Sequence, residues 1–479
     1  MTEYKSNAIN ATRWQAVNTI GVNALQFVFS VVLARQILPS KFGIFAIILI
    51  ICTIAQTISN GGLKEALIRR KGLADIDLST TFLYNVISSV ILYSVIYLIS
   101  PYISIYFNEP ELNKALRLTA ISIPINAFAL AFDAKIVHSL DFKKLSIINI
   151  ISISISGIIS VILAKYGYGI WALVFQYILS AILISTLTIV FSSHYPKLRF
   201  SNAKFKELFN NYGRKLMYSS ILNTIFSQIY SLITGKLWNT TQLAFYSKAS
   251  NLSAQSVQIP TTIIDTISLP LLSKTQDNND ILYKRYRQLI QASAFTLFPL
   301  CLIIGALAKP IITVLLTEMW IESSKYLQIL VFAFMLYPIH ALNLNLLKIK
   351  GRSDLIFKLE IIKIASILCT LAITVWFGIE VMCVGQIIVS FIALICNTYY
   401  TGKILNLGIK QQLKDITPAF TLSIITFSIT YLIPAMIENN YLSLILGLSV
   451  ALSIYFGCAK IFKIAGYNEF KLLFLKNGK

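Results

Sequence analysis

Charged residues are scarce in this chain, and the motifs of the common enzyme classes are absent. Only 13% of its 479 residues are charged, whereas 56% are hydrophobic. That balance excludes an ordinary soluble domain. The sequence contains no HExxH, GxSxG or Walker motif, and its three histidines are scattered. We therefore predict no catalytic residues and no metal site, and we expect that the protein is not an enzyme.

Cysteine is also rare, and none of its spacings indicates chemistry. The chain has six cysteines without a CxxC pair, and all of them fall inside apolar runs. Such residues are typical of small apolar packing positions. We predict neither disulfides nor cysteine ligands at Cys52, Cys301, Cys369, Cys383, Cys396 and Cys458.

Long apolar runs are what the chain has in quantity. A run of about 20 apolar residues crosses a bilayer as a helix, because lipid offers no partner for unpaired backbone groups. The pattern predicts an all-α, polytopic integral membrane protein with about fourteen transmembrane helices. The predicted spans are 13–35, 42–66, 80–107, 115–140, 145–165, 169–192, 214–236, 243–272, 286–308, 322–348, 355–377, 380–402, 415–437 and 440–463.

The net charge of +21 is distributed along the chain by topology. Lysine and arginine concentrate in every second gap between the runs, such as 69–71, 197–215 and 274–287. This bias is the positive-inside rule, which predicts that both termini are cytoplasmic. The basic loops then contact anionic lipid headgroups, and no nucleic-acid partner is expected.

A short internal repeat predicts two halves. Arg35 and Lys236 each end an apolar run, and each is followed at similar spacing by a small residue and an aromatic one. Parallel repeats of this kind build several transporter folds. We predict an N-terminal six-helix bundle at 1–192, a cytoplasmic amphipathic linker at 193–213, a second six-helix bundle at 214–402, and two additional helices with a cytoplasmic tail at 403–479.

Polar stripes inside the predicted helices are the main signal of function. Residues three or four apart share one helix face. The eighth span carries such a stripe at Lys248, Asn251, Gln255, Gln258, Thr262 and Asp265. Shorter stripes occur at Gln56, Asn60 and Lys64, at Ser122, Asn126 and Asp133, and at Asn223, Ser227, Tyr230 and Thr234.

These stripes predict a hydrophilic cavity, because an ionised side chain at the bilayer centre needs water or a partner. Lys64 and Lys248 could hold an anion such as a phosphate. The candidate substrate-binding residues are Lys248, Asn251, Gln255, Gln258, Lys64, Asn60, Gln56 and Asn223. The carboxylates that could bind a coupling proton or Na⁺ are Asp265, Asp133 and Glu65. The alternative is that the stripes form hydrogen bonds between packed helices.

Five segments of the chain look familiar as a set: LARQILPSKFGIFAI (33–47), GGLKEALIRRKG (61–72), LDFKKL (140–145), GYGIWALVFQ (167–176) and LAFYSKASNLS (243–253). Together they resemble the polysaccharide transporter, or oligosaccharide flippase (Wzx-type), family. That family belongs to a superfamily that includes multidrug exporters and the lipid II flippase. Lys248 stands where the family commonly has arginine, whereas Lys64 and Glu65 depart from its usual small or apolar pair.

The resemblance implies two six-helix bundles around a central cavity, with two added helices. It implies a bacterial inner-membrane protein that flips undecaprenyl-diphosphate-linked oligosaccharide by alternating access, for O-antigen, capsule or exopolysaccharide. It further implies cationic cavity residues that hold the pyrophosphate, an ion gradient of H⁺ or Na⁺ in place of a cofactor, and a polysaccharide polymerase and chain-length machinery as partners.

Three other functions are weighed against this one. A cation-coupled multidrug exporter on the same architecture would favour a more acidic cavity. A membrane polymerase or glycosyltransferase would need a large outer loop with paired carboxylates, and the outer loops here are short. A scaffold would leave the polar helix faces unexplained.

Overall fold

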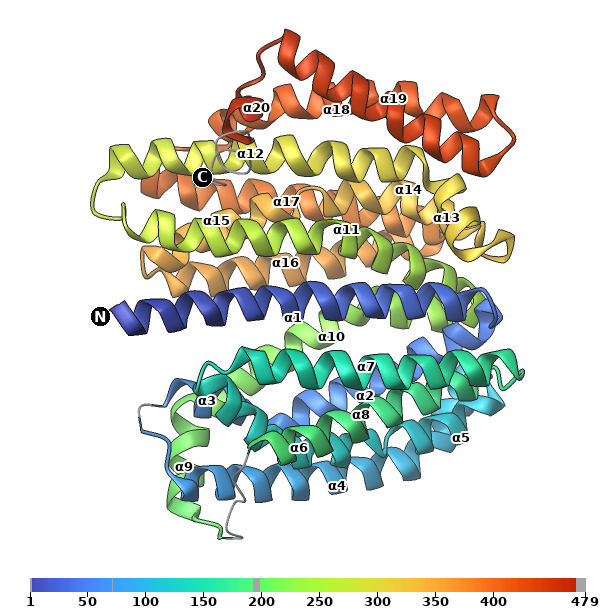
Figure 1. Ribbon diagram of the computed structural model, residues 1–479, viewed down its shortest axis with the longest axis vertical. Coiled ribbons are helices and arrows are strands. Elements are labelled where there is room, and N and C mark those ends of the chain that lie inside the picture. The colour runs from blue at the N-terminus through green and yellow to red at the C-terminus, as the bar shows by residue number, and fades with distance from the viewer. Residues whose placement is uncertain (1, 71, 193–198, 471–479) are drawn as a thin grey trace. The chain divides into compact units, whose positions relative to one another are not determined.

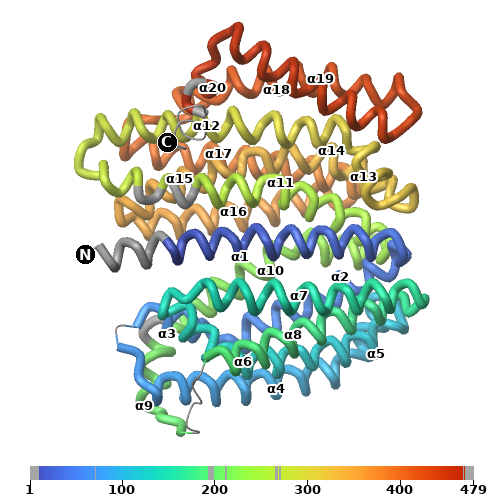
Figure 2. Tube along the Cα trace, in the orientation of Figure 1, coloured from blue at the N-terminus to red at the C-terminus, as the bar shows by residue number. Residues whose placement is uncertain are grey.

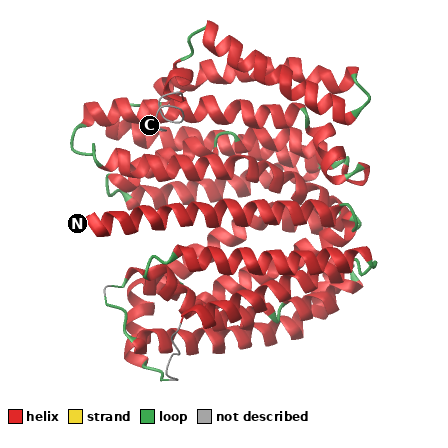
Figure 3. Ribbon diagram, in the orientation of Figure 1, coloured by secondary structure: helices red, strands yellow, loops and turns green. Residues whose placement is uncertain are grey.

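A computed structural model describes residues 2–70, 72–192 and 199–470. Side chains are described within these ranges, except those of residues 2–9, 211–212, 265–267, 269–270, 468 and 470. The described chain is built of helices joined by short turns, without a strand, as Figure 3 shows. The all-α prediction is therefore confirmed.

The chain divides into two compact units, the first ending at Ala244 and the second beginning at Phe245. The helices of the first unit are α1 (Thr2–Ala34), α2 (Pro39–Asn60), α3 (Leu63–Arg69), α4 (Asp75–Phe107), α5 (Pro110–Thr119), α6 (Ser122–His138), α7 (Phe142–Lys165), α8 (Ile170–Ser192), α9 (Asn202–Leu208), the π-helix η1 (Phe209–Gly213) and α10 (Arg214–Leu237). They follow one another from blue to green in Figure 1.

Helix α11 (Thr240–Ser273) begins in the first unit and continues into the second. The second unit then contains α12 (Asn279–Ala306), α13 (Ala308–Leu316), the 3-10 helix η2 (Glu318–Trp320), α14 (Ser323–Phe334), α15 (Tyr337–Ile349), α16 (Ser353–Thr374), the 3-10 helix η3 (Val375–Phe377), α17 (Ile379–Leu405), α18 (Ile409–Met436), α19 (Asn440–Ile461) and α20 (Ala465–Phe470). The trace of these segments runs from green to red in Figure 2.

Eleven segments of the described chain are long and apolar enough to cross a membrane. Each of them falls on a span predicted from the sequence. Three more predicted spans are helical but too polar to be counted: α10, α11 and α16, the last with Lys358, Glu360 and Lys363. The chain is thus a multi-pass membrane protein, and the number fourteen stays a prediction. The predicted bundle and linker boundaries also stay predictions, and residues 193–198 of that linker lie outside the described chain.

The first unit has its core where α2, α4, α5 and α8 meet. Apolar residues recur on the inner face of α2, and Ile47 and Ile48 are fully buried there. They pack with Leu112 and Leu116 of α5 and with Val174 of α8. Burying these side chains against one another fixes the position of α2 beside its neighbours.

Two glycines interrupt the helical path from α2 to α3. Gly61 and Gly62 have φ values of 58° and 67°, which residues with a Cβ adopt only with strain. A Cβ on Gly62 would also lie 2.5 Å from the carbonyl oxygen of Gly213, at the end of η1. The break therefore ends α2, redirects the chain into α3, and lets α3 approach the start of α10.

The beginning of α11 completes the first unit. The backbone of Gly43 on α2 lies so close to Thr240 that a Cβ would overlap the Thr240 carbonyl group. The Thr240 hydroxyl donates to Glu109 Oε1 at 2.7 Å, and Leu243 is fully buried in the core cluster of α2, α5 and α8. The contacts of residues 240–243 thus belong to the core of the first unit.

The second unit is organised around α12, which packs along α18 and α20. Phe295 is buried at this junction against Tyr455 of α19, whose hydroxyl donates to the Phe295 carbonyl at 2.8 Å. Arg287 of α12 donates to both oxygens of Asp415 of α18, at 2.7 and 2.5 Å. The two C-terminal transmembrane helices are therefore joined to the second unit by apolar packing and by a charge pair.

Candidate functional site

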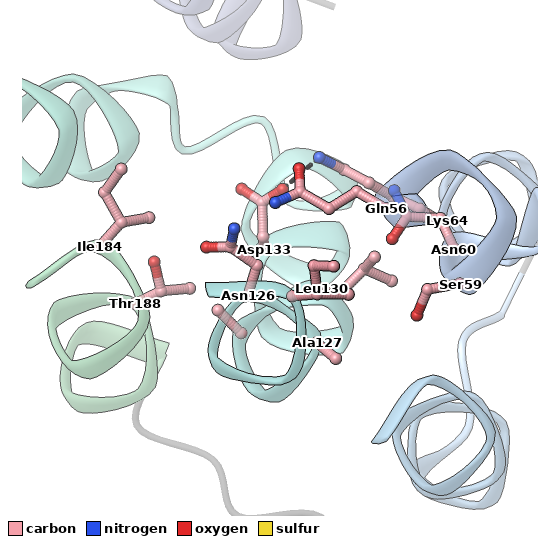
Figure 4. Close-up of a pocket in the computed structure, with 12 residues that line it drawn as sticks. Gln56, Ser59, Asn60, Lys64, Asn126, Ala127, Leu130, Asp133, Ile184 and Thr188 are labelled. Carbon is pink, nitrogen blue, oxygen red and sulfur yellow. Dashed lines mark ion pairs between the residues drawn. The ribbon is translucent and has the colours of Figure 1, made fainter. Parts of the chain in front are cut away.

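Two of the predicted polar stripes meet around one cavity in the first unit. The cavity has a volume of about 190 Å³. It is lined by Gln56, Ser59, Asn60, Lys64, Ile123, Asn126, Ala127, Ala129, Leu130, Asp133, Ile184 and Thr188, and Figure 4 shows these side chains. The residues come from α2, α3, α6 and α8. A polar cavity of this size holds water or a small polar group.

The local structure explains why these positions meet. Gln56 and Asn60 are one helical turn apart on α2, so both face the same side. Lys64 would continue that face on a straight helix, and the turn at Gly61 and Gly62 keeps it at the cavity. Asn126 and Asp133 are two turns apart on α6 and share its face in the same way.

The two charged residues of the cavity pair with each other. Lys64 Nζ and an Asp133 carboxylate oxygen form an ion pair, and Figure 4 shows the two side chains and Gln56 extending toward one another. The side chains of Lys64 and Asp133 are 32% and 23% exposed. Among the described lining residues, Lys64 is the one cation and Asp133 the one anion. The lining of the cavity is therefore close to neutral, with several amides and hydroxyls around one charge pair.

Two predicted residues near this cavity do not line it. Glu65 follows Lys64 on α3, but its side chain is exposed and lies outside the lining set. Asn223 on α10 is exposed as well. Its neighbour Thr224 instead meets Thr57 of α2, with 3.4 Å between the two hydroxyl oxygens. Helix α10 therefore contacts α2 partly through hydrogen bonding between helices, by a residue outside the predicted stripe.

The stripe on α11 has one buried cation and more open amides. Lys248 is 8% exposed, and its Nζ lies 5.4 Å from the ring centroid of Trp320. Asn251 and Gln258 are exposed, and Gln255 is half-buried. Lys248 thus combines burial with a cation–π contact, while the amides that follow it on α11 remain accessible.

The remaining candidate, Asp265, lies on α11, but its side chain is outside the described part of the chain. Within that part, no three His, Cys, Asp or Glu residues come together as a metal site would require. The prediction of a coupling ion at Asp133, Asp265 or Glu65 stays a prediction.

The sequence analysis did not single out Ser59 and Thr188, which also line the cavity. Ser59 lies between two predicted residues, but it faces α4 as well, and its hydroxyl is 3.3 Å from the Ser88 hydroxyl. Thr188 lies on α8, where Ser185 and Ser192 are three and four residues away and share its face. That spacing was a signal, but the place of Thr188 at the cavity depends on the packing of α8 on α6.

A row of buried polar residues on α4 was also missed. Asp77, Thr81 and Asn85 are fully buried at intervals of four. Asp77 Oδ1, Thr81 Oγ1 and both side-chain polar atoms of Asn85 have no hydrogen-bond partner among the residues that the structure describes. Buried atoms of this kind are usually satisfied by ordered water. The regular spacing was a signal that sequence reasoning could have used.

Charged residues connect the short helix α9 to the rest of the first unit. Arg70 lies 3.1 Å from Asp77 Oδ2 and 3.2 Å from Glu207 Oε1. Lys204 donates to Glu207 at 3.0 Å, and this hydrogen bond, together with the charge of Arg70, lowers the pKa of the Glu207 carboxyl. The carboxylate of Glu207 is thus held in its charged form between two cations.

A second cavity lies in the second unit and has a different character. Its volume is about 510 Å³. It is lined by Lys309, Thr313, Glu318, Ile321, Pro434, Glu438 and Asn440. None of these residues belongs to a predicted stripe, and all lie near helix ends.

Comparison with known proteins connects this geometry to a family. Residues 32–325 match the family described as polysaccharide biosynthesis protein. The chain is 23% identical to the lipopolysaccharide biosynthesis protein WzxC of Escherichia coli (strain K12), over 91% of this chain and 89% of that protein. It is also 23% identical to the succinoglycan biosynthesis transport protein ExoT of Rhizobium meliloti (strain 1021), over 66% of this chain and 64% of that protein.

A solved structure shares the fold. The lipid II flippase MurJ in its inward closed conformation matches with a TM-score of 0.77 at 16% identity, over 93% of this chain and 98% of that chain. At this level of identity the match shows the fold alone. The fold class predicted from the sequence is confirmed, since this transporter architecture covers nearly the whole chain.

Proposed function

The chain belongs to the polysaccharide biosynthesis protein family, and from this premise we propose that it is a flippase for lipid-linked oligosaccharides. It moves undecaprenyl-diphosphate-linked repeat units across the bacterial cytoplasmic membrane by alternating access, for surface polysaccharide biosynthesis. The names of its relatives WzxC and ExoT, and the fold that it shares with MurJ, support this proposal. The protein acts as a transporter rather than as an enzyme.

The observation that carries the proposal is the cavity of the first unit. A diphosphate-sugar headgroup needs hydrogen-bonding partners and a cation while it crosses the apolar part of the bilayer. The cavity supplies Lys64 together with amides from Gln56, Asn60 and Asn126. The polyprenyl tail is as apolar as the lipid and can stay in it. A site of about 190 Å³ holds a diphosphate group rather than a complete oligosaccharide.

The finer parts of the proposal concern orientation and energy. The concentration of lysine and arginine in alternate loops supports cytoplasmic termini. An H⁺ or Na⁺ gradient supplies the energy, with Asp133, Asp265 and Glu65 as candidate coupling residues. A polysaccharide polymerase and its chain-length machinery remove the product on the outer side.

Cells that lack this protein test the proposal. We expect undecaprenyl-diphosphate repeat units to accumulate facing the cytoplasm and surface polysaccharide to disappear. Lipid extraction with mass spectrometry identifies the accumulated glycan, and a plasmid copy of the gene restores export. Unchanged polysaccharide with new sensitivity to cationic drugs would contradict the proposal and support the multidrug exporter alternative.

A further inference from the structure

The cation of the first-unit cavity, Lys64, is already paired with a carboxylate of the protein, Asp133. If Lys64 binds a diphosphate, its ammonium has to leave the carboxylate of Asp133. Both oxyanions are good partners for an ammonium, and they compete for the same donor. The carboxylate belongs to the protein and is always present, whereas the diphosphate comes and goes.

We propose that Asp133 is an internal counter-ion that takes the place of the substrate's diphosphate on Lys64 whenever the site is empty. This inference rests on the proposed function. In the empty state the pair is closed and the cavity is nearly neutral. When a diphosphate enters, Lys64 turns to its oxygens and the Asp133 carboxylate is released. When the diphosphate leaves, the carboxylate returns to the ammonium and prevents immediate rebinding.

The surroundings of the pair fit such an exchange. Lys64 is the cation that faces Asp133 from α3, while α2 contributes the amides of Gln56 and Asn60, and α8 contributes Thr188. Figure 4 shows these polar side chains gathered around the two charged ones. Amide N–H groups can donate to the released carboxylate as well as to a phosphate oxygen. The carboxylate therefore has partners in the cavity in both states.

The other charged groups near the pair do not line the cavity: Lys135 on α6, Glu65 on α3 and Arg70 all lie outside the lining set. His138, five residues further along α6, contacts the carbonyl oxygen of Arg70, with Nε2 at 3.0 Å. Arg70 itself pairs with Asp77 and Glu207, and Glu65 is exposed on α3. The exchange of partners thus involves one ammonium, one carboxylate and the incoming diphosphate.

The partial exposure of the Lys64 and Asp133 side chains also favours an exchange of partners on Lys64. A fully buried pair would be costly to open, because each charge would lose its partner in a medium of low polarity. At 32% and 23% exposure, Lys64 and Asp133 can each be solvated while the pair is open. The pair is therefore strong enough to close in the empty site and weak enough to be displaced.

Removing the Asp133 carboxylate should tighten binding of the diphosphate, because the ammonium of Lys64 then has no competing partner in the protein. We would measure the dissociation constant of farnesyl diphosphate for the full-length protein in phosphatidylcholine nanodiscs, with farnesol as the uncharged comparison. Asp133→Asn removes the competitor and should bind farnesyl diphosphate about fivefold more tightly, the ratio expected for a partly exposed ion pair. Turnover in a flipping assay should fall, because release is no longer assisted.

Matched variants separate this role from a structural one. Asp133→Asn combined with Lys64→Gln should bind no more tightly than Lys64→Gln alone, because the gain acts through Lys64. Glu111→Gln opens the exposed Lys41–Glu111 pair in the same unit and should leave the affinity unchanged. The exchanged pair, Lys64→Asp with Asp133→Lys, keeps both the cation and its competitor and should bind farnesyl diphosphate like the original chain.

Equal or weaker binding of farnesyl diphosphate by folded Asp133→Asn protein would overturn the counter-ion inference. If that variant does not fold, loss of binding in the exchanged pair overturns it instead. Absence of binding in every variant also counts against it. The proposed flippase function is judged separately, by repeat-unit accumulation in cells, so it can stand while this inference fails.

Discussion

The backbone of Gly62 lies directly against the backbone carbonyl of Gly213, where the break between α2 and α3 meets the end of η1. This contact joins the turn that precedes Lys64 to the segment that leads into α10. Neither residue has a side chain, so the approach depends on the absence of a Cβ. The contact therefore places the end of η1 against the backbone that leads into the cavity.

Gly62→Ala tests this contact. The variant adds a strained φ of 67° and an overlap with the Gly213 carbonyl oxygen, so we expect destabilisation of about 2–3 kcal/mol or more. Thermal unfolding of the purified protein would measure it. Gly72→Ala is the matched control, because Gly72 has a φ of 76° but no heavy atom within 4 Å of an added Cβ. The free energy of unfolding of Gly72→Ala should fall only by the cost of the strained φ, about 1–2 kcal/mol. Equal losses in both variants would mean that the contact has no energetic role.

The Arg287–Asp415 pair predicts a second stability effect. The Asp415 side chain is 2% exposed, so Arg287→Ala leaves a buried carboxylate without its cation. We expect a loss of about 3–5 kcal/mol, seen as a lower unfolding temperature. Arg287→Met with Asp415→Leu should recover most of it. Asp354→Asn, which removes the exposed partner of Arg352, should change little, since the side chains of that pair are 49% and 53% exposed. A larger loss in the double variant than in Arg287→Ala would contradict this account.

The attachment of α9 should depend on pH through Glu207. Its pKa in the folded protein is lowered, first by the hydrogen bond from Lys204 and then by the charge of Arg70. A lowered pKa contributes stability above the ordinary value of 4.5, and that contribution is lost as the pH falls through the folded value. Hydrogen exchange of the α9 amides, corrected for the intrinsic effect of pH, should therefore accelerate on acidification below about pH 4.5. Glu207→Gln should remove that dependence, and an unchanged profile would exclude Glu207 as its source.

Cysteine labelling can measure how accessible the polar side chains of the α11 stripe are to water. In a background without the native cysteines, we expect cysteines at positions 251 and 258 to react with a water-soluble thiol reagent, because Asn251 and Gln258 are exposed. A cysteine at position 257 should be protected, since Val257 is 2% exposed. Protection at 251 and 258 would indicate that this face meets lipid or protein instead of water.

The charge of Lys248 should matter for transport. Lys248→Ala should lower flipping by about tenfold, since a hydrogen bond to a charged group contributes about 1.5–3 kcal/mol. Lys248→Arg should keep most of the activity, because arginine preserves both the charge and the contact with the Trp320 ring. Flipping would be compared at equal protein levels. Equal activity of the two variants would remove Lys248 from the site.

Helical periodicity made part of the cavity predictable. Gln56 and Asn60 on α2, and Asn126 and Asp133 on α6, follow steps that place them on shared faces, and the structure brings both faces to one cavity. Periodicity does not say which helices are neighbours. The ion pair of Lys64 with Asp133 joins residues far apart in the sequence, so it depends on the packing of α3 against α6.

Other features needed the packed structure. Thr188 shares its helix face with Ser185 and Ser192, but its place at the cavity depends on the packing of α8 on α6. Asn223 belongs to a stripe but is exposed and lies outside the lining set. Lys248 looked like an open cavity cation, yet it is 8% exposed beside Trp320. A side chain's position within a stripe fixes its angle around the helix, whereas its burial depends on the neighbouring helices. The angle of a side chain around its helix can therefore be predicted from sequence, whereas its burial cannot.

The contribution of Thr240 and Leu243 to the first unit has a consequence for biosynthesis. The hydroxyl of Thr240 reaches Glu109, and Leu243 fills the core cluster of α2, α5 and α8. The ribosome therefore has to extend well into α11 before the first unit can close its core inside the membrane. A nascent chain released after α10 would leave that core open at Gly43, so it should be recognised by membrane quality-control proteases as an incomplete product.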